Sequence, residues 1–195
     1  MKIIGITGGV GSGKSQVLSY LENEYHAVVC QADQVAWKLQ EPGQECYTQI
    51  VRCFGENILN EDSTINRGEL GQIVFADKDK LNVLNRIMHP AVKEYILKWV
   101  QSEQAAKTAY FIIEAALLLE ENYNQICDEM WYIYCDENIR RERLRSSRGY
   151  SDEKISAMIA SQLSEQIFRK ECHVVIDNSG DFRDTCYQIG KAMKC

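Results

Sequence analysis

The segment Gly8–Ser15 constrains this chain most, because it carries the pattern Gly-x-x-x-x-Gly-Lys-Ser. It follows the apolar run Ile3–Ile6 and precedes a helix-like stretch, Gln16–Glu24. Glycines let the backbone curl so that consecutive N–H groups point at anionic oxygens, and the following helix adds its positive N-terminal end. The strand, the full motif and the helix in this order predict a phosphate-binding loop; the alternative is an ordinary glycine-rich turn.

The expected ligand of this loop is ATP with Mg²⁺. Lys14 can reach the β- and γ-phosphates, and the Ser15 hydroxyl can ligate Mg²⁺. Because Gln16 keeps its backbone N–H, it is included among the nucleotide contacts. The predicted contacts are Gly9, Gly11, Ser12, Gly13, Lys14, Ser15 and Gln16.

Composition limits the class of protein. A chain of 195 residues that is 45% hydrophobic suits one α/β domain with an insertion. The net charge of −6 disfavours nucleic-acid binding, and no apolar run has the length of a membrane span.

The eight cysteines show no C-x-x-C spacing and no secretory signal precedes them, so we expect a reduced cytoplasmic protein with mostly buried thiols. Cys195 is expected to be exposed. Oligomeric state is not predicted.

Short apolar runs alternate with helical stretches, which predicts a five-stranded parallel sheet flanked by helices. One helix is expected to begin near Asp152 and continue to Leu163, and Asp181 is expected to cap the last. Residues 42–107 show helical periodicity and no convincing strand, so they are either an acceptor-binding insertion or helices that cover the sheet. The core is then about 1–41 and 108–195. The predicted strands are Ile3–Ile6, Ala27–Cys30, Tyr110–Ile113, Met130–Cys135 and Val174–Ile176.

Three carboxylates follow predicted strands: Asp33, Glu114 and Asp177. In open α/β sheets, ligands gather at the carboxyl ends of the strands. Asp33 suits the carboxylate that orients an attacking hydroxyl, and Glu114 suits a position near Mg²⁺. The alternative for each is a helix cap or a polar strand exit.

Five arginines lie between positions 140 and 148. One interpretation is a lid, about 140–152, that closes over ATP and neutralises the transferring phosphoryl group; the other is a solvated helix face. The arginines are Arg140, Arg141, Arg143, Arg145 and Arg148.

Two further expectations concern packing. His89-Pro90 is expected between two helices, and the tryptophans are expected to be packing residues.

Taken together, the sequence resembles the dephospho-CoA kinase family, from the first strand to about Gly180. The opening Thr7–Ser15 is similar to that family's loop, and further matches include Ala32-Asp33, His89-Pro90 and Gln162. Residues at the spacing of its helical CoA-binding signature are Ile65, Arg67, Leu70, Phe75, Leu84, Pro90 and Val92.

The resemblance implies a P-loop kinase that phosphorylates the ribose 3′-hydroxyl of dephospho-CoA. Asp33, Lys14, Arg140 and Arg148 would then be catalytic, and Asn178 and Gly180 would wrap the adenine of ATP. Acceptor contacts are expected at Asp33, Arg67, His89 and Leu117, and metal contacts at Ser15 and Glu114, for the latter directly or through water.

This chain departs from the family pattern at several positions, which are Gln16, Gln31, Glu114, Ala116, Ser147 and Phe168. Two alternatives therefore stay open. One is a nucleotide-binding paralogue without catalysis, which Gln31, Ser147 and Phe168 would support. The other is a P-loop kinase for a different small hydroxyl substrate.

Overall fold

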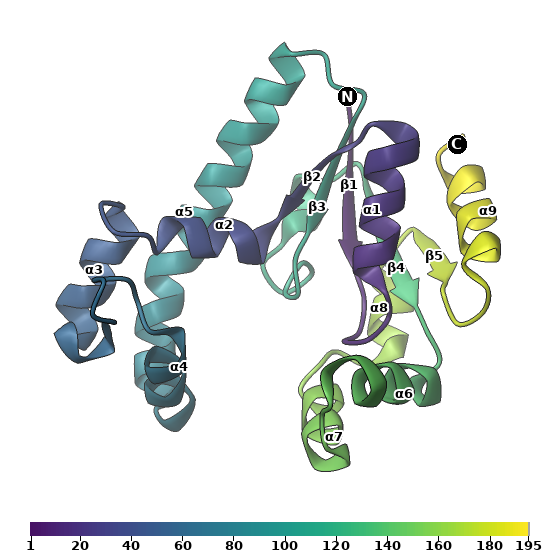
Figure 1. Ribbon diagram of the computed structural model, residues 1–195. Coiled ribbons are helices and arrows are strands. Elements are labelled where there is room, and N and C mark those ends of the chain that lie inside the picture. Colours follow the sequence, from purple (N-terminus) through teal and green to yellow (C-terminus); the bar gives the residue numbers. More distant parts are fainter. Residues whose placement is uncertain (195) are drawn as a thin grey trace. The chain divides into compact units, whose positions relative to one another are not determined.

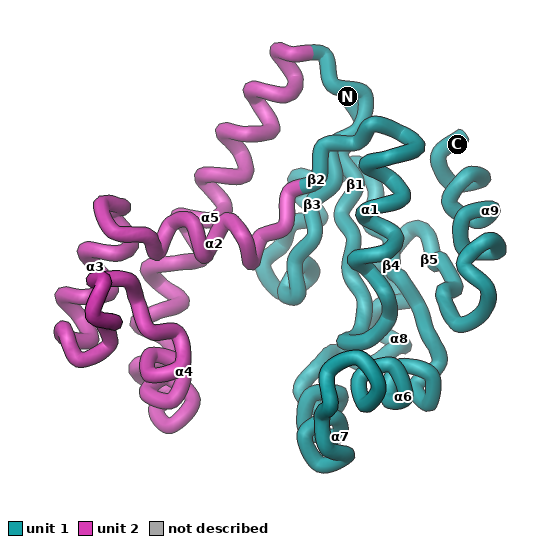
Figure 2. The backbone as a smooth tube through the Cα atoms, viewed as in Figure 1, with its two compact units in different colours: residues 1–29, 107–195 teal, residues 30–106 magenta. Residues whose placement is uncertain are grey.

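A computed structural model describes residues 1–194, so Cys195 lies outside the described residues. The chain divides into two compact units, an α/β unit of residues 1–29 with 107 onward and a helical unit of residues 30–106 (Figure 2). The predicted insertion, residues 42–107, falls almost entirely within the helical unit, which also includes the segment from Cys30 to Glu41.

The α/β unit is built on the predicted sheet, whose strand order is β2-β3-β1-β4-β5 (Figure 1). The pairs β1–β3, β1–β4 and β4–β5 are parallel. Each strand overlaps its predicted apolar run, which confirms the fold class. The strands are β1 (Lys2–Thr7), β2 (Val28–Gln31), β3 (Tyr110–Glu114), β4 (Glu129–Tyr134) and β5 (Val174–Asp177).

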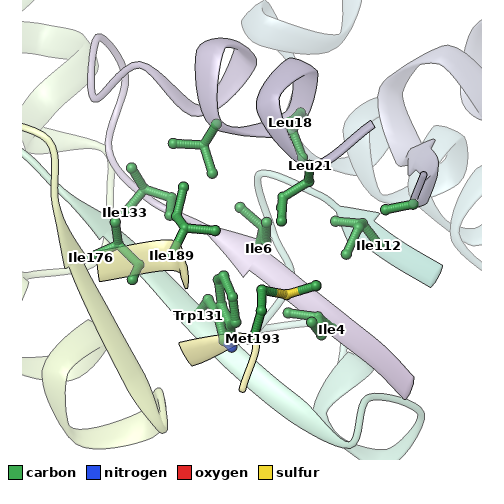
Figure 3. Packing of buried hydrophobic residues seen from close by; sticks show 12 residues of the cluster. Ile4, Ile6, Leu18, Leu21, Ile112, Trp131, Ile133, Ile176, Ile189 and Met193 are labelled. Carbon is green, nitrogen blue, oxygen red and sulfur yellow. The ribbon is translucent and has the colours of Figure 1, made fainter. Parts of the chain in front are cut away.

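One face of this sheet is covered by α1 (Lys14–Tyr25) and α9 (Phe182–Ala192). Figure 3 shows the apolar cluster between them, in which Trp131 of β4 is fully buried. Burying a large apolar side chain contributes about 1.5–3 kcal/mol, so this cluster holds α1, and the loop that precedes it, against the sheet. Further members are Ile4, Ile6, Val17, Leu18, Leu21, Ile176, Ile189 and Met193.

The remaining helices of the α/β unit follow β4. They are α6 (Glu137–Arg148), α7 (Asp152–Ala160) and α8 (Glu165–Glu171), and a short 3₁₀ helix, η2 (Tyr123–Gln125), precedes β4. The expectation that α7 continues to Leu163 is wrong, because the helix ends at Ala160 and Ser161 is its C-cap. Asp181 caps α9 as predicted, by accepting a hydrogen bond from the backbone N–H of Arg183.

The helical unit is organised around the long helix α5 (Lys78–Ala105), against which α2, α3 and α4 pack. Side-chain caps begin α4 and α5, where Asn66 and Asp77 accept hydrogen bonds from backbone N–H groups. The shorter elements are α2 (Ala32–Leu39), α3 (Glu45–Phe54), the 3₁₀ helix η1 (Glu56–Ile58) and α4 (Arg67–Ala76).

The expectation that His89-Pro90 separates two helices is wrong, because Pro90 lies inside α5. Proline in a helix interior lacks the N–H donor and costs roughly 3 kcal/mol relative to alanine. Here tertiary packing outweighs that cost: α5 buries Met88 and Val92 on either side of the proline, then Ile96 and Val100. Local helix-breaking signals cannot report such packing.

Burial of the thiols follows the prediction for most of them: Cys30, Cys46, Cys127, Cys135 and Cys172 are buried, whereas Cys53 is exposed. Burial raises the pKa of Cys30 and Cys127 to about 12. Among the described residues, no helix combines the length and apolar character that crossing a membrane requires.

Candidate nucleotide site

The loop between β1 and α1 is shaped by glycines at positions where a side chain would not fit. Gly13, the N-cap of α1, has φ 85°, a left-handed conformation that favours glycine. A Cβ atom there would also collide with Nδ2 of Asn178, and one at Gly9 would collide with Nη1 of Arg140. Gly11 likewise has a positive φ, of 77°. The backbone therefore curls tightly around the start of α1, as a phosphate cradle requires.

Lys14 and Glu114 come together at the carboxyl ends of β1 and β3. Parallel pairing places Ile6 opposite Glu114, so the last residue of β3 lies beside the start of the loop. Lys14 Nζ lies 3.8 Å from a Glu114 carboxylate oxygen and donates a 2.9 Å hydrogen bond to the carbonyl of Gly8. An ammonium and a carboxylate thus meet at the mouth of the loop, while Ser15 and Gln16 are exposed on the first turn of α1.

The side chain of Asn178 is hydrogen-bonded to the phosphate loop. Its side chain is buried, and Nδ2 donates a 2.8 Å hydrogen bond to the carbonyl of Ser12. Its Oδ1 accepts a 3.0 Å hydrogen bond from the hydroxyl of Thr185 on α9. Asn178 is also predicted to belong to the loop that wraps the adenine, which stays a prediction; the exposed Gly180 follows in the same loop.

Removing the Asn178 side chain should therefore loosen the phosphate loop. Asn178→Ala leaves a buried carbonyl and a buried hydroxyl without this partner, which we expect to lower the free energy of unfolding by about 1–3 kcal/mol and to weaken ATP binding. Urea unfolding and calorimetric titration with ATP measure the two effects. Asn138→Ala, at an exposed position of α6, is the control and should change neither quantity. Wild-type stability and ATP affinity in Asn178→Ala would contradict this structural role.

The arginines of α6 divide into inward and outward groups. Arg143 donates from Nη2 to the carbonyl of Asn178 at 3.0 Å and from Nη1 to the carbonyl of Ser12 at 3.5 Å. Arg140 packs against Gly9, and its Nε is buried with no hydrogen-bond partner among residues 1–194. Sequence reasoning included Arg143 in the cluster but gave it no role. The sequence signal that could have indicated a role for Arg143 is its spacing of three residues from Arg140, which places both arginines on one helix face.

The outward arginines contact residues of α6, of α7 and of the segment between these helices. Arg141 pairs with Glu137 at 2.8 Å and donates to the hydroxyl of Ser156 on α7. Arg145 pairs with Asp152 at 2.6 Å. Arg148 is exposed, and its hydrogen bond to the Tyr150 hydroxyl lowers the pKa of that tyrosine. One face of α6 therefore meets the phosphate loop and the other is solvated, whereas closure of this segment over ATP stays a prediction.

A cavity of about 300 Å³ lies beside the loop within the α/β unit. Gly9, Arg140 and Gln162 line it, together with Tyr132 and Phe168, whose rings stack with centroids 4.8 Å apart. Burial raises the pKa of Tyr132 to about 12, with Glu165 acting in the same direction, so its hydroxyl stays neutral. The cavity thus offers an aromatic wall, an arginine and loop backbone in one place.

The predicted acceptor residues lie in different parts of the chain. Asp33 is exposed in the first turn of α2, whereas Gln31 occupies the N-cap position. His89 is partly buried within α5, and Leu117 belongs to the α/β unit, where its side chain is exposed. Asp33 lies two residues after the end of β2 and does not occupy the N-cap of α2, so the alternative of an N-cap does not apply; its role toward the acceptor stays a prediction.

Arg67 lines a second cavity, which lies wholly within the helical unit and measures about 460 Å³. Its guanidinium lies 4.5 Å from the ring centroid of Trp37, which is 48% exposed. Trp37 was expected only to pack; the exposed indole under an arginine is a feature that sequence reasoning missed. The remaining lining comes from Gln40, Glu41, Pro42, Asn60, Thr64, Ile65 and Asn66.

Comparison with known proteins identifies the family to which the sequence is similar. The sequence model of the family "Dephospho-CoA kinase" matches residues 2–184. Dephospho-CoA kinases of Carboxydothermus hydrogenoformans and Shouchella clausii are 37% and 35% identical, each over 97% of this chain and over 91% and 96% of their own lengths.

Solved structures share the fold. A Thermus thermophilus protein superposes with a TM-score of 0.81 at 24% identity, covering 99% of this chain and 96% of its own. Dephospho-CoA kinase from Campylobacter jejuni superposes with a TM-score of 0.73, also at 24% identity, covering 100% of this chain and 96% of its own. A shikimate kinase from Acinetobacter baumannii, at 15% identity, superposes with a TM-score of 0.55, covering 100% of this chain and 93% of its own.

The five-stranded sheet, the glycine-rich loop and these neighbours define the class: the fold is that of the P-loop kinases. Within that class, the chain belongs to the dephospho-CoA kinase family, as the match over residues 2–184 shows. It is accordingly an enzyme, an ATP-dependent kinase.

Proposed function

We propose that this chain transfers the γ-phosphoryl group of ATP to the ribose 3′-hydroxyl of dephospho-CoA, giving CoA and ADP in the cytoplasm. Family membership over nearly the whole chain supports the acceptor. The observation that carries the phosphoryl chemistry is the meeting of Lys14 and Glu114 at the mouth of the glycine loop.

On the donor side, the loop N–H groups from Gly9 to Gln16 would surround the phosphates, and Lys14 would move from the Gly8 carbonyl to the β- and γ-phosphates. Mg²⁺, for which the Ser15 hydroxyl and the Glu114 carboxylate are suitable oxygen ligands, would neutralise charge between the β- and γ-phosphates. The loop at Asn178 and Gly180 is assigned to the adenine.

On the acceptor side, we assign the cavity of Trp37 and Arg67 to dephospho-CoA, because a guanidinium suits a pyrophosphate oxygen. His89 and Leu117 are assigned to the same substrate. Asp33 orients the 3′-hydroxyl and accepts its proton as the bond from O3′ to the γ-phosphorus forms and the bond to the β,γ-bridging oxygen breaks. Arg140 and Arg148 stabilise the charge on the transferring group and help to exclude water.

The test is ADP release from Mg²⁺·ATP with and without dephospho-CoA, with the product identified by mass spectrometry. We expect slow turnover with ATP alone and a sharp rise with dephospho-CoA, accompanied by CoA. Faster phosphorylation of adenosine or a sugar would show a different acceptor. Tight ATP binding without transfer to any acceptor would show a paralogue that has lost catalysis.

A further inference from the structure

The phosphate loop is hydrogen-bonded to a side chain from a distant part of the sequence. The backbone N–H of Val10 donates to Oε1 of Gln162 at 3.0 Å. Gln162 lies between α7 and α8, on the wall of the 300 Å³ cavity, and its side chain is partly buried. Backbone N–H groups of such loops are the donors that bind phosphate oxygens, so a carboxamide oxygen here takes an acceptor position that a phosphate could take.

The position of Val10 in the loop identifies which phosphate competes. Lys14, whose ammonium reaches β- and γ-phosphates, donates to the carbonyl of Gly8 at 2.9 Å. The segment Gly8–Val10 therefore forms the side of the loop that meets the terminal phosphates.

The surroundings of Gln162 favour an anion at the same place. Nη1 of Arg140 lies so close to Gly9 that a Cβ atom there would collide with it, and the same Cβ would lie 3.4 Å from Oε1 of Gln162. Arg140 Nε is buried and has no hydrogen-bond partner within the described part of the chain. The Arg140 guanidinium, with its buried Nε–H, and the N–H of Val10 thus lie at the same part of the cavity as the Gln162 carboxamide oxygen, which carries only a partial negative charge.

We propose that Gln162 is a positioning residue whose carboxamide oxygen occupies a subsite for a terminal phosphate oxygen of ATP. Binding of ATP exchanges the Val10 N–H from Gln162 to the phosphate and releases the α7–α8 connection, residues 161–164, from the loop. This assignment rests on the proposed function only in that the loop must bind ATP; it makes no use of the acceptor.

The exchange predicts that removing the competitor strengthens nucleotide binding. In Gln162→Ala, ATP no longer displaces a hydrogen bond whose net contribution is about 0.5–1.5 kcal/mol, so its dissociation constant should fall by roughly 2- to 10-fold. ADP should gain less and AMP should not gain. Calorimetric titration with each nucleotide measures this, and Gln166→Ala, at an exposed position of α8, is the control and should match wild type.

A second readout follows the bond itself. In nucleotide-free protein, the Val10 amide resonance in ¹⁵N-labelled samples should differ between wild type and Gln162→Ala, because only wild type has the carboxamide acceptor. With Mg²⁺ and the non-hydrolysable β,γ-imido analogue of ATP, the two resonances should nearly coincide, because the phosphate is then the acceptor in both. A purely structural role for Gln162 would leave the difference in place.

The outcomes separate this inference from the proposed function. Failure of wild-type protein to bind ATP would overturn both. ATP bound by wild type, but with equal or weaker affinity in a folded Gln162→Ala protein, would overturn the exchange alone. Gln162→Leu, which keeps the size of the side chain without an acceptor, guards against loss of folding in the alanine variant and should show the same tightening.

Discussion

Lys14→Ala should reduce phosphoryl transfer by about a hundredfold to a thousandfold, the scale expected when a positioned donor to developing charge is lost. The ammonium of Lys14 both contacts the loop backbone at Gly8 and lies near Glu114. Without it, the β- and γ-phosphates would enter the loop beside the Glu114 carboxylate and lack this ammonium. ATP affinity should fall as well, because the ammonium binds ground state and transition state alike. Steady-state ADP release at saturating acceptor measures the loss.

The fold should survive this change, since Lys14 is partly buried at the loop and not part of the apolar cluster. Lys14→Met, which keeps the apolar part of the side chain, separates loss of charge from loss of packing and should be equally inactive. Lys170→Ala is the matched control, because its side chain is 82% exposed on α8. Near-normal activity in a folded Lys14→Ala protein would show that the nucleotide does not bind at this loop.

The strands and the phosphate loop could be predicted because their signals are local. A strand of a parallel sheet is buried on both faces, so it appears as an uninterrupted apolar run such as Tyr110–Ile113. The loop has its glycines where the backbone takes a left-handed conformation, as at Gly13. Once the sheet is parallel, the carboxyl ends of its strands share one edge, which explains why Glu114 lies near Lys14; its place near Mg²⁺ stays a prediction.

The rest of the site depends on packing between segments far apart in the chain. Nothing near Asn178 in the sequence indicates that its side chain reaches the carbonyl of Ser12, because that contact needs β5 and the loop side by side. The division of the arginines of α6 follows from which helix face meets the loop. The continuity of α5 through Pro90 likewise depends on α2, α3 and α4 packing on it.

Two of the departures from the family pattern, Phe168 and Ser147, have local structural explanations. Phe168, at a position where lysine is common in the family, is buried and stacks on Tyr132, while the guanidinium of the adjacent Arg169 lies 4.7 Å from the ring centroid of Tyr134. A positive charge is therefore kept one residue away. Ser147 donates its hydroxyl hydrogen bond to the carbonyl of Arg143, within α6. Phe168 and Ser147 therefore each have a contact within the α/β unit that accounts for the residue present.

Gln31 is a third departure from the family pattern, and it lies near the proposed acceptor residue Asp33 in the sequence. It stands where the family usually has an aspartate, and its side chain accepts a hydrogen bond from that of Gln34, across the first turn of α2. Gln31 makes this hydrogen bond with a neutral carboxamide. The proposed mechanism therefore assigns the proton-accepting carboxylate to Asp33 alone. Gln31→Asp should change turnover by much less than the loss of Asp33, and steady-state assays of both variants at one ATP concentration make the comparison.

Asp33→Asn should then cut turnover by roughly a hundredfold or more, the scale of losing a positioned general base. Asparagine keeps the shape of the side chain but cannot accept the proton of the 3′-hydroxyl. ATP binding should stay nearly intact, because Asp33 is assigned to the acceptor hydroxyl and is not among the residues assigned to the nucleotide. Since Asp33 is exposed and does not occupy the N-cap of α2, the variant should unfold at the same urea concentration as wild type.

Two outcomes would contradict this prediction. An Asp33→Asn protein as active as wild type would refute the assignment of Asp33 as the proton acceptor. Equal losses of ATP binding and turnover would mean that Asp33 supports the nucleotide site instead of the acceptor hydroxyl.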